Sequence, residues 1–330
     1  MKANQLYKFL EFLAQQNLVW APQRINGELV IEQLTDPKKI ELTSELPLHS
    51  FKRILVPPKE VLFNYKDKKI IPDVKSPHQV IFGLTIPDLK AITMLDSIFT
   101  KDHYYQNRLE NTLIIGHGLV PKENYQFFID KFEEDILEHI KYDIFLAIKG
   151  KDFVVYTGSE DGQRILDDFG YKYYEHIEYV GPIREQGPDA QMLKIREKFY
   201  NEENEEIWQE LGQRCIECGK CTLICPTCFC FDIFDNPALQ KNSGQRFRCW
   251  GVCFYTDFSE VAGTEIDSKK PKFLNTTAER IRFWYEHKFV RIPDEISQLG
   301  CVGCGRCTKV CPVGIDIKKN LQRILKGKVK

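Results

Sequence analysis

CIECGKCTLICP, residues 215–226, and CVGCGRCTKVCP, residues 301–312, repeat one arrangement of cysteines. Each stretch has the spacing Cys-x2-Cys-x2-Cys-x3-Cys and ends in a proline. The chain has 330 residues and twelve cysteines, and no cysteine precedes Cys215. Cysteine chemistry is therefore confined to the C-terminal third of the chain, and the long N-terminal part must be explained separately.

The spacing of the two runs is the ligand pattern of bacterial two-cluster ferredoxins, in which the fourth cysteine of each run binds the cluster of the other run. Three thiolates two residues apart can reach three irons of a 4Fe-4S cube from one loop, and the fourth thiolate then comes from elsewhere. We therefore expect two 4Fe-4S clusters with exchanged ligands. The first set is Cys215, Cys218, Cys221 and Cys311, and the second set is Cys301, Cys304, Cys307 and Cys225.

Glycines lie between the predicted ligands at Gly219, Gly303 and Gly305, where the missing Cβ lets the backbone approach a cluster. Pairs of the CxxC type also bind zinc, as in zinc ribbons. Four cysteines followed by proline, occurring twice, favour iron-sulfur clusters over zinc. Helices are expected around the runs at 192–211, 277–289 and 317–325, which favours the α-helical type of two-cluster ferredoxin.

Four further cysteines lie in a long insertion between the runs, residues 226–300. They are Cys228, Cys230, Cys249 and Cys253. Two closely spaced pairs of thiols could bind a third iron-sulfur cluster or a zinc ion. Alternatively, free cysteines pack as small hydrophobic side chains, here beside the neighbouring aromatic residues. Both interpretations stay open from the sequence.

The first 200 residues show a mixed α/β pattern. An amphipathic helix is expected near the N-terminus, with Leu6, Phe9, Leu10 and Leu13 on one face. Strands are expected at 113–116, 144–148 and 153–156, the last two joined by a turn at Gly150. Helices are expected from Pro87 to Ile98, through 127–140, and from an N-cap at Ser159 to a stop at Gly170.

The segment 178–189 is rich in glycine and proline and predicts a linker. We therefore predict an α+β protein with two domains. Residues 1–185 form a mixed α/β scaffold or docking domain. Residues 186–330 form a mostly α-helical, ferredoxin-like domain with two clusters and the cysteine-containing insertion.

Composition excludes several classes of function. The net charge is -1, and Lys and Arg alternate with Asp and Glu, which argues against nucleic acid as the main partner. No apolar stretch approaches the roughly 20 residues of a membrane span, and the N-terminus lacks the apolar core of a signal peptide. Twelve cysteines in ligand-like spacings predict reduced thiols and a cytoplasmic location.

Six stretches resemble the iron-sulfur subunit that cytoplasmic sulfhydrogenases, as their β subunit, share with anaerobic sulfite reductases. They follow one another in the same order through most of the chain: KRILVPPKEVLF (52–63), GLTIPDLKAITMLDSIF (83–99), YYQNRLENTLIIG (104–116), CIECGKCTLICPTCFCFD (215–232), CWGVCFYTDFSEVAGTE (249–265) and CVGCGRCTKVCPVGID (301–316). Members of this family carry extra cysteines in the N-terminal half, which this chain lacks.

The resemblance implies a relay of electrons without an active site of its own. The expected partners are a subunit with FAD and a 2Fe-2S cluster, which handles NAD(P)H, and the small and large subunits of a nickel-iron hydrogenase. A siroheme sulfite reductase subunit is the alternative partner, in a sulfite or polysulfide reductase. A third possibility, that the N-terminal domain is itself an enzyme or binding module, lacks a recognisable catalytic constellation.

Overall fold

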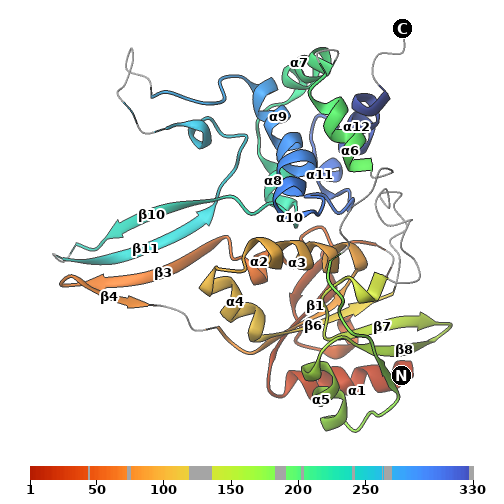
Figure 1. Ribbon diagram of the computed structural model, residues 1–330. Helices are drawn as coiled ribbons and strands as arrows, with labels where there is room; N and C mark the ends of the chain where they lie inside the picture. Colours follow the sequence, from red (N-terminus) through yellow and green to blue (C-terminus); the bar gives the residue numbers. More distant parts are fainter. Residues whose placement is uncertain are drawn as a thin grey trace. The chain divides into compact units, whose positions relative to one another are not determined.

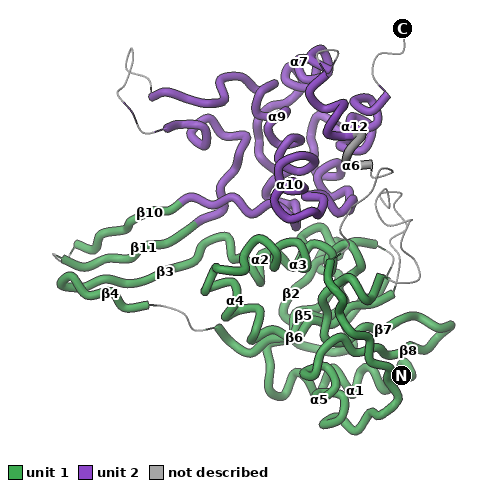
Figure 2. The backbone as a smooth tube through the Cα atoms, viewed as in Figure 1, with its two compact units in different colours: residues 1–183, 233–248 green, residues 184–232, 249–330 purple. Residues whose placement is uncertain are grey.

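The computed structural model describes residues 1–43, 45–72, 76–118, 136–182, 191–201 (backbone only for 191–194), 204–239, 242–261, 263 and 270–326. The chain divides into two compact units (Figure 2): unit 1, residues 1–183 and 233–248, and unit 2, residues 184–232 and 249–330. Helices and strands are both abundant, in agreement with the predicted α+β class. The predicted domain boundary at 185/186 and most of the predicted linker lie outside the described residues.

Unit 1 is built on a seven-stranded sheet with the order β2-β1-β5-β6-β7-β8-β9. Its central strands β1, β5, β6 and β7 are parallel, whereas β2 and β8 each pair antiparallel with a neighbour and β9 runs parallel to β8. The strands are β1 Leu18–Ile25, β2 Glu28–Gln33, β5 Gln79–Leu84, β6 Thr112–His117, β7 Ile144–Lys149, β8 Asp152–Thr157 and β9 Tyr174–His176.

Helices cover both faces of this sheet (Figure 1). Helices α1 (Ala3–Ala14) and α5 (Glu160–Asp168) lie on one face, where Phe9, Leu10 and Leu166 join a core with Ile115 of β6. Helices α2 (Lys52–Leu55), α3 (Ile86–Ile98) and α4 (His103–Glu110) lie on the other face. Buried strands with apolar residues on both sides, such as β5, are typical of parallel sheets covered in this way.

Most elements predicted in the N-terminal part are present. The N-terminal helix buries the four expected side chains, β7 and β8 form the expected hairpin, and Gly150 has a φ of 65° in the turn. Ser159 caps α5 by accepting a hydrogen bond of 3.0 Å from the Gly162 N–H, and Gly170 follows with a φ of 82°. The helix predicted through 127–140 falls mainly on residues 119–135, outside the described part, and Ile136–Glu138 forms a short 3-10 helix.

A second sheet, with the order β10-β11-β3-β4, was not predicted. Strands β10 (Phe231–Pro237) and β11 (Ser243–Trp250) come from the insertion between the cysteine runs, and they pair with β3 (Lys59–Lys66) and β4 (Lys69–Pro72) from the N-terminal part. Their tip is tied by a hydrogen bond of 2.8 Å from the Asp67 N–H to the Asn242 carbonyl. This pairing places residues 233–248 in unit 1.

Arg248 anchors the inserted hairpin within unit 1. Its side chain is only 7% exposed, and it ion-pairs with Glu60 at 2.6 Å and with Asp102 at the start of α4. Burial alone would raise the pKa of Asp102, but hydrogen bonds from Arg248 and from the Tyr105 N–H outweigh burial and lower it. Ionised Asp102 therefore stabilises the fold at neutral pH, and this contribution is lost as the pH falls through the lowered pKa.

We predict that Arg248→Met lowers the free energy of unfolding by about 3 kcal/mol, because it removes the ion-pair partner of Asp102 and one of the two arginines, Arg248 and Arg108, that neutralise the buried Glu60. Urea unfolding followed by Trp20 fluorescence measures this, since Trp20 is the tryptophan of unit 1. The matched control is Arg246→Met on the same strand, whose ion pair with Asp235 is exposed and should contribute little. Equal urea midpoints for the two variants would contradict the anchoring role.

Unit 2 is mostly helical in its described residues. The single helix predicted over 192–211 is wrong: α6 (Gln191–Phe199) and α7 (Glu205–Arg214) are separate helices. The Asn204 side chain donates a hydrogen bond of 2.6 Å to the Lys198 carbonyl and so competes with helix continuation. Later helices are α8 (Lys220–Ile224), α9 (Thr277–Glu286), α10 (Ile292–Ile296), α11 (Arg306–Val310) and α12 (Ile317–Lys326).

Within the described ranges, no helix combines the length and apolar content required to span a membrane.

Candidate functional site

The two cysteine runs fold in the same way in unit 2. Gly219 and Gly305 adopt left-handed conformations, with φ of 70° and 73°, and each is followed at once by a short helix, α8 or α11. Each glycine carbonyl accepts backbone hydrogen bonds of 3.0 to 3.1 Å from the first turn of its helix. The third cysteine of each run, Cys221 or Cys307, therefore sits within the first turn of its helix, directly after a sharp reversal of the chain.

A second left-handed position follows the first cysteine of each run. It is occupied by Gly303 in one run, with a φ of 69°, and by Glu217 in the other, with a φ of 55°. Left-handed glutamate is strained. Its carboxylate accepts hydrogen bonds from Thr277 at 2.6 Å and from Arg280, which hold the loop in place. Sequence reasoning missed Glu217, although the glycine at the equivalent position of the second run signals the conformation.

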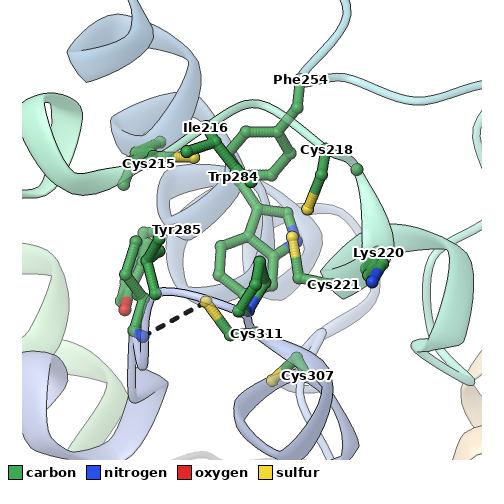
Figure 3. Close-up of a pocket in the computed structure, with 15 residues that line it drawn as sticks. Cys215, Ile216, Cys218, Lys220, Cys221, Phe254, Trp284, Tyr285, Cys307 and Cys311 are labelled. Atoms are coloured by element: carbon green, nitrogen blue, oxygen red, sulfur yellow. Dashed lines mark hydrogen bonds between the residues drawn. The ribbon is translucent and has the colours of Figure 1, made fainter.

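One pocket of unit 2 brings the two runs together. Its wall contains the four cysteines of the first predicted set and one cysteine of the second: Cys215, Cys218, Cys221, Cys311 and Cys307. Figure 3 shows these thiols bordering the same space, with the Trp284 indole among them. The rest of the wall is largely apolar and includes Phe254, Ile281 and Trp284. Cysteines 96 positions apart in the chain, Cys215 and Cys311, thus face one cavity.

Hydrogen-bond donors surround the sulfur atoms of this pocket. The Ile315 N–H donates to Cys311 Sγ at 3.2 Å (Figure 3), and the Glu217 N–H donates to Cys215 Sγ at 3.4 Å. Trp284 Nε1 is buried in the pocket wall and has no hydrogen-bond partner in the described part of the chain. A buried donor without a partner is costly, and a sulfur-rich group in the pocket would satisfy it. The donor set and the thiols together fit a 4Fe-4S cluster.

The second predicted set also lies close together. Burial raises the pKa of the Cys307 thiol most, and the nearby Cys225, Cys301 and Cys304 raise it further, as does Cys221 of the first set. Burial raises the pKa of Cys301 to about 12. Thiols in such surroundings stay protonated until a cation replaces the proton, as is usual for buried ligand cysteines.

The four cysteines of the insertion lie just before the β10–β11 hairpin, near its end or just after it. Cys253 is buried, and its pKa is raised to about 12. Burial is the largest cause, and the nearby Cys230 is the next. The Cys230 carbonyl accepts a backbone hydrogen bond of 2.8 Å from the Gly251 N–H, and Cys249 lies near the end of β11. Among the described residues, no three His, Cys, Asp or Glu side chains form a ready-made site for a single metal ion.

Comparisons with known proteins agree with this geometry. Residues 214–315 match the family model of a 4Fe-4S dicluster domain. Sulfhydrogenase 2 subunit beta of Pyrococcus furiosus is 25% identical, over 97% of this chain and 96% of that protein. The predicted resemblance to iron-sulfur β subunits is confirmed. A domain of this kind holds two 4Fe-4S clusters, as predicted. Because such clusters carry electrons, the match supports a role in electron transfer.

A shorter similarity points to a different oxidoreductase. F420-dependent formate dehydrogenase subunit beta of Methanocaldococcus jannaschii is 28% identical, over 52% of this chain and 38% of that protein. No solved structure matches the chain significantly. The similarities therefore extend to subunits of oxidoreductases with different substrates.

We predict that Trp284→Phe loosens the bound cluster without unfolding unit 2. Phenylalanine keeps an aromatic ring in the wall and removes only the indole N–H, so the loss is that of a hydrogen bond to the cluster. Since outer-shell partners contribute about 10- to 100-fold to metal affinity, loss of iron to a chelator should become roughly ten-fold faster.

The matched control is Tyr285→Phe in the same wall, because the Tyr285 hydroxyl interacts with Asn320 at 3.4 Å. This variant should release iron at the rate of the unchanged chain. Equal rates in Trp284→Phe and the unchanged chain would show that the indole N–H does not reach the cluster.

Proposed function

We propose that this chain is the relay subunit of a multisubunit oxidoreductase of the sulfhydrogenase type. In this proposal it passes electrons between a flavin-containing NAD(P)H subunit, which also carries a 2Fe-2S cluster, and the small and large subunits of a nickel-iron hydrogenase. The observation that carries the proposal is a pocket lined by cysteines of both runs. The similarity to a sulfhydrogenase β subunit over nearly the whole chain supports the choice of complex.

We further propose the exchanged ligand sets for the two clusters. Cys215, Cys218, Cys221 and Cys311 hold the first cluster, and Cys301, Cys304, Cys307 and Cys225 hold the second. The shared pocket supports the first set, and the closeness of Cys225, Cys301 and Cys304 to Cys307 supports the second, although Cys221 of the first set is also near Cys307. Because each run serves both clusters, neither run can hold its cluster alone.

Unit 1 serves, in this proposal, as the scaffold that docks the partner subunits. Electron transfer between proteins requires the partners to be held close and in a fixed orientation. The alternative is the same relay in a sulfite or polysulfide reductase. Copurification distinguishes the two: a nickel-binding large subunit supports the hydrogenase, and a siroheme protein supports the reductase.

The first test is the cofactor content of the isolated chain. Purified without air, it should contain about eight irons, with the broad visible absorption of 4Fe-4S clusters. It should carry no bound flavin and turn over neither hydrogen nor sulfite by itself. Zinc in place of iron would contradict the cluster assignment, and stoichiometric flavin would contradict the simple relay.

Single substitutions test the ligand exchange. Cys311→Ser should remove the same electron paramagnetic resonance signal as Cys215→Ser, because both residues belong to the first proposed set. Cys304→Ser is the matched control from the second set and should remove the other signal. If Cys311→Ser and Cys304→Ser instead affect one common signal, each run holds its own cluster.

A third metal centre in the insertion remains a prediction, and Cys253→Ser tests it. With a third 4Fe-4S cluster, the unchanged chain should contain about twelve irons and the variant about eight. With packing alone, both contain about eight irons and the variant loses only stability. If the substitution does not change the iron content, Cys253 is not a metal ligand and serves only as a small buried side chain.

A further inference from the structure

Lys288 is a buried lysine in the middle of unit 2. It is only 2% exposed, although lysine is almost never fully buried without a partner. It lies in a π-helix, His287–Arg291, in which the Ile292 N–H reaches back to the His287 carbonyl. Single π-helical turns are rare and occur often at functional sites. This position is therefore a candidate for a role beyond packing.

The ammonium group of Lys288 has three donor hydrogens and three acceptors around it. Nζ lies 3.3 Å from Cys225 Sγ, 3.1 Å from Thr227 Oγ1 and 2.9 Å from the Gly300 carbonyl oxygen. No Asp or Glu in the described part of the chain forms an ion pair with it. The nearest source of negative charge is therefore the sulfur of Cys225, a proposed ligand of the second cluster.

The backbone at Gly300 approaches Lys288 closely enough to make this contact. Gly300 precedes Cys301, its N–H donates to the Lys288 carbonyl at 2.9 Å, and its own carbonyl accepts from Lys288 Nζ. A Cβ on Gly300 would lie 2.9 Å from Lys288 Cα, so only glycine allows this approach. Lys288 thus joins the end of the first run, at Cys225, to the start of the second.

A fixed positive charge at this place acts on the electron affinity of the second cluster. The three acceptors around Lys288 Nζ, one of them the Cys225 sulfur, match the three donor hydrogens of an ammonium group. Reduction by one electron, supplied by a partner of the relay, adds one negative charge beside the ammonium group and breaks no bond. A hydrogen bond and a charge at a ligand sulfur stabilise that added charge and raise the reduction potential.

We propose that Lys288 is a positioning residue that sets the reduction potential of the second cluster through its hydrogen bond to Cys225. The inference rests on the proposed function, because it requires the cluster held by Cys225. It adds that the two clusters differ in potential although their ligand spacings are identical.

The test is a redox titration of the full chain, followed by electron paramagnetic resonance, for Lys288→Met. Removing the charge should lower the potential of one cluster and leave the other unchanged. The expected size is at least a ten-fold change in the reduction equilibrium, which is about 59 mV for one electron. Lys288→Arg keeps the charge and should shift the potential less than Lys288→Met.

Lys309→Met is the matched control, because Lys309 lies between Cys307 and Cys311 but is exposed, so that solvent screens its charge. It should move neither potential by a comparable amount. If Lys288→Met does not take up iron, Lys288→Gln, which keeps donor hydrogens and loses the charge, should show the same lowered potential.

Two outcomes separate the inference from the function on which it rests. About eight irons with both potentials unmoved in Lys288→Met overturns the role of Lys288 and leaves the relay intact. Equal shifts in Lys288→Met and Lys288→Arg overturn it as well, because charge is then not the cause. A chain without iron-sulfur signals in its unchanged form overturns the proposed function itself.

Discussion

The need of a 4Fe-4S cube for one thiolate at each iron is the constraint on which unit 2 depends. A compact loop supplies three thiolates, so the fourth must come from a distant part of the chain. Cys311 faces the same pocket as Cys215, Cys218 and Cys221, and Phe254, Ile281 and Trp284 form part of its apolar wall. The cost of closing such a loop grows slowly with its length, by about 0.6 kcal/mol per doubling. A long insertion between the runs is therefore tolerated.

Part of this insertion, residues 233–248, belongs to unit 1. Strand β10 begins directly after Cys230, and β11 ends at Trp250, after Cys249. Between these points the hairpin pairs with β3, and Arg248 is held by Glu60 and Asp102. Main-chain pairing and a buried ion network thus fix residues 233–248 in unit 1.

Local patterns allowed much of this structure to be predicted, and non-local contacts account for what was missed. Ser159 and Gly170 predicted the limits of α5, because these signals act over a few residues. The pocket wall contains the first predicted cysteine set together with Cys307 of the second, and the assignment of ligands stays a prediction. The β10–β11 hairpin was missed, since its pairing partner lies more than a hundred residues earlier. Glu217 was missed because its strained conformation depends on Arg280, on a helix 60 residues later. The one helix predicted over 192–211 is instead two helices, α6 and α7, because the Asn204 side chain competes for the Lys198 carbonyl.

Identical ligand spacings cannot by themselves give two clusters a direction of electron flow, so a difference must come from the surrounding side chains. Near the first set, the buried Arg280 is ion-paired with Glu217, so its charge is largely cancelled beside Cys215 and Cys218. Near the second set, Lys288 has neutral oxygens and a cysteine sulfur as its partners. In our proposal, the uncancelled charge of Lys288 would make the second cluster the better electron acceptor. Electrons would then rest on the second cluster, and entry through the first and exit through the second would be the downhill direction.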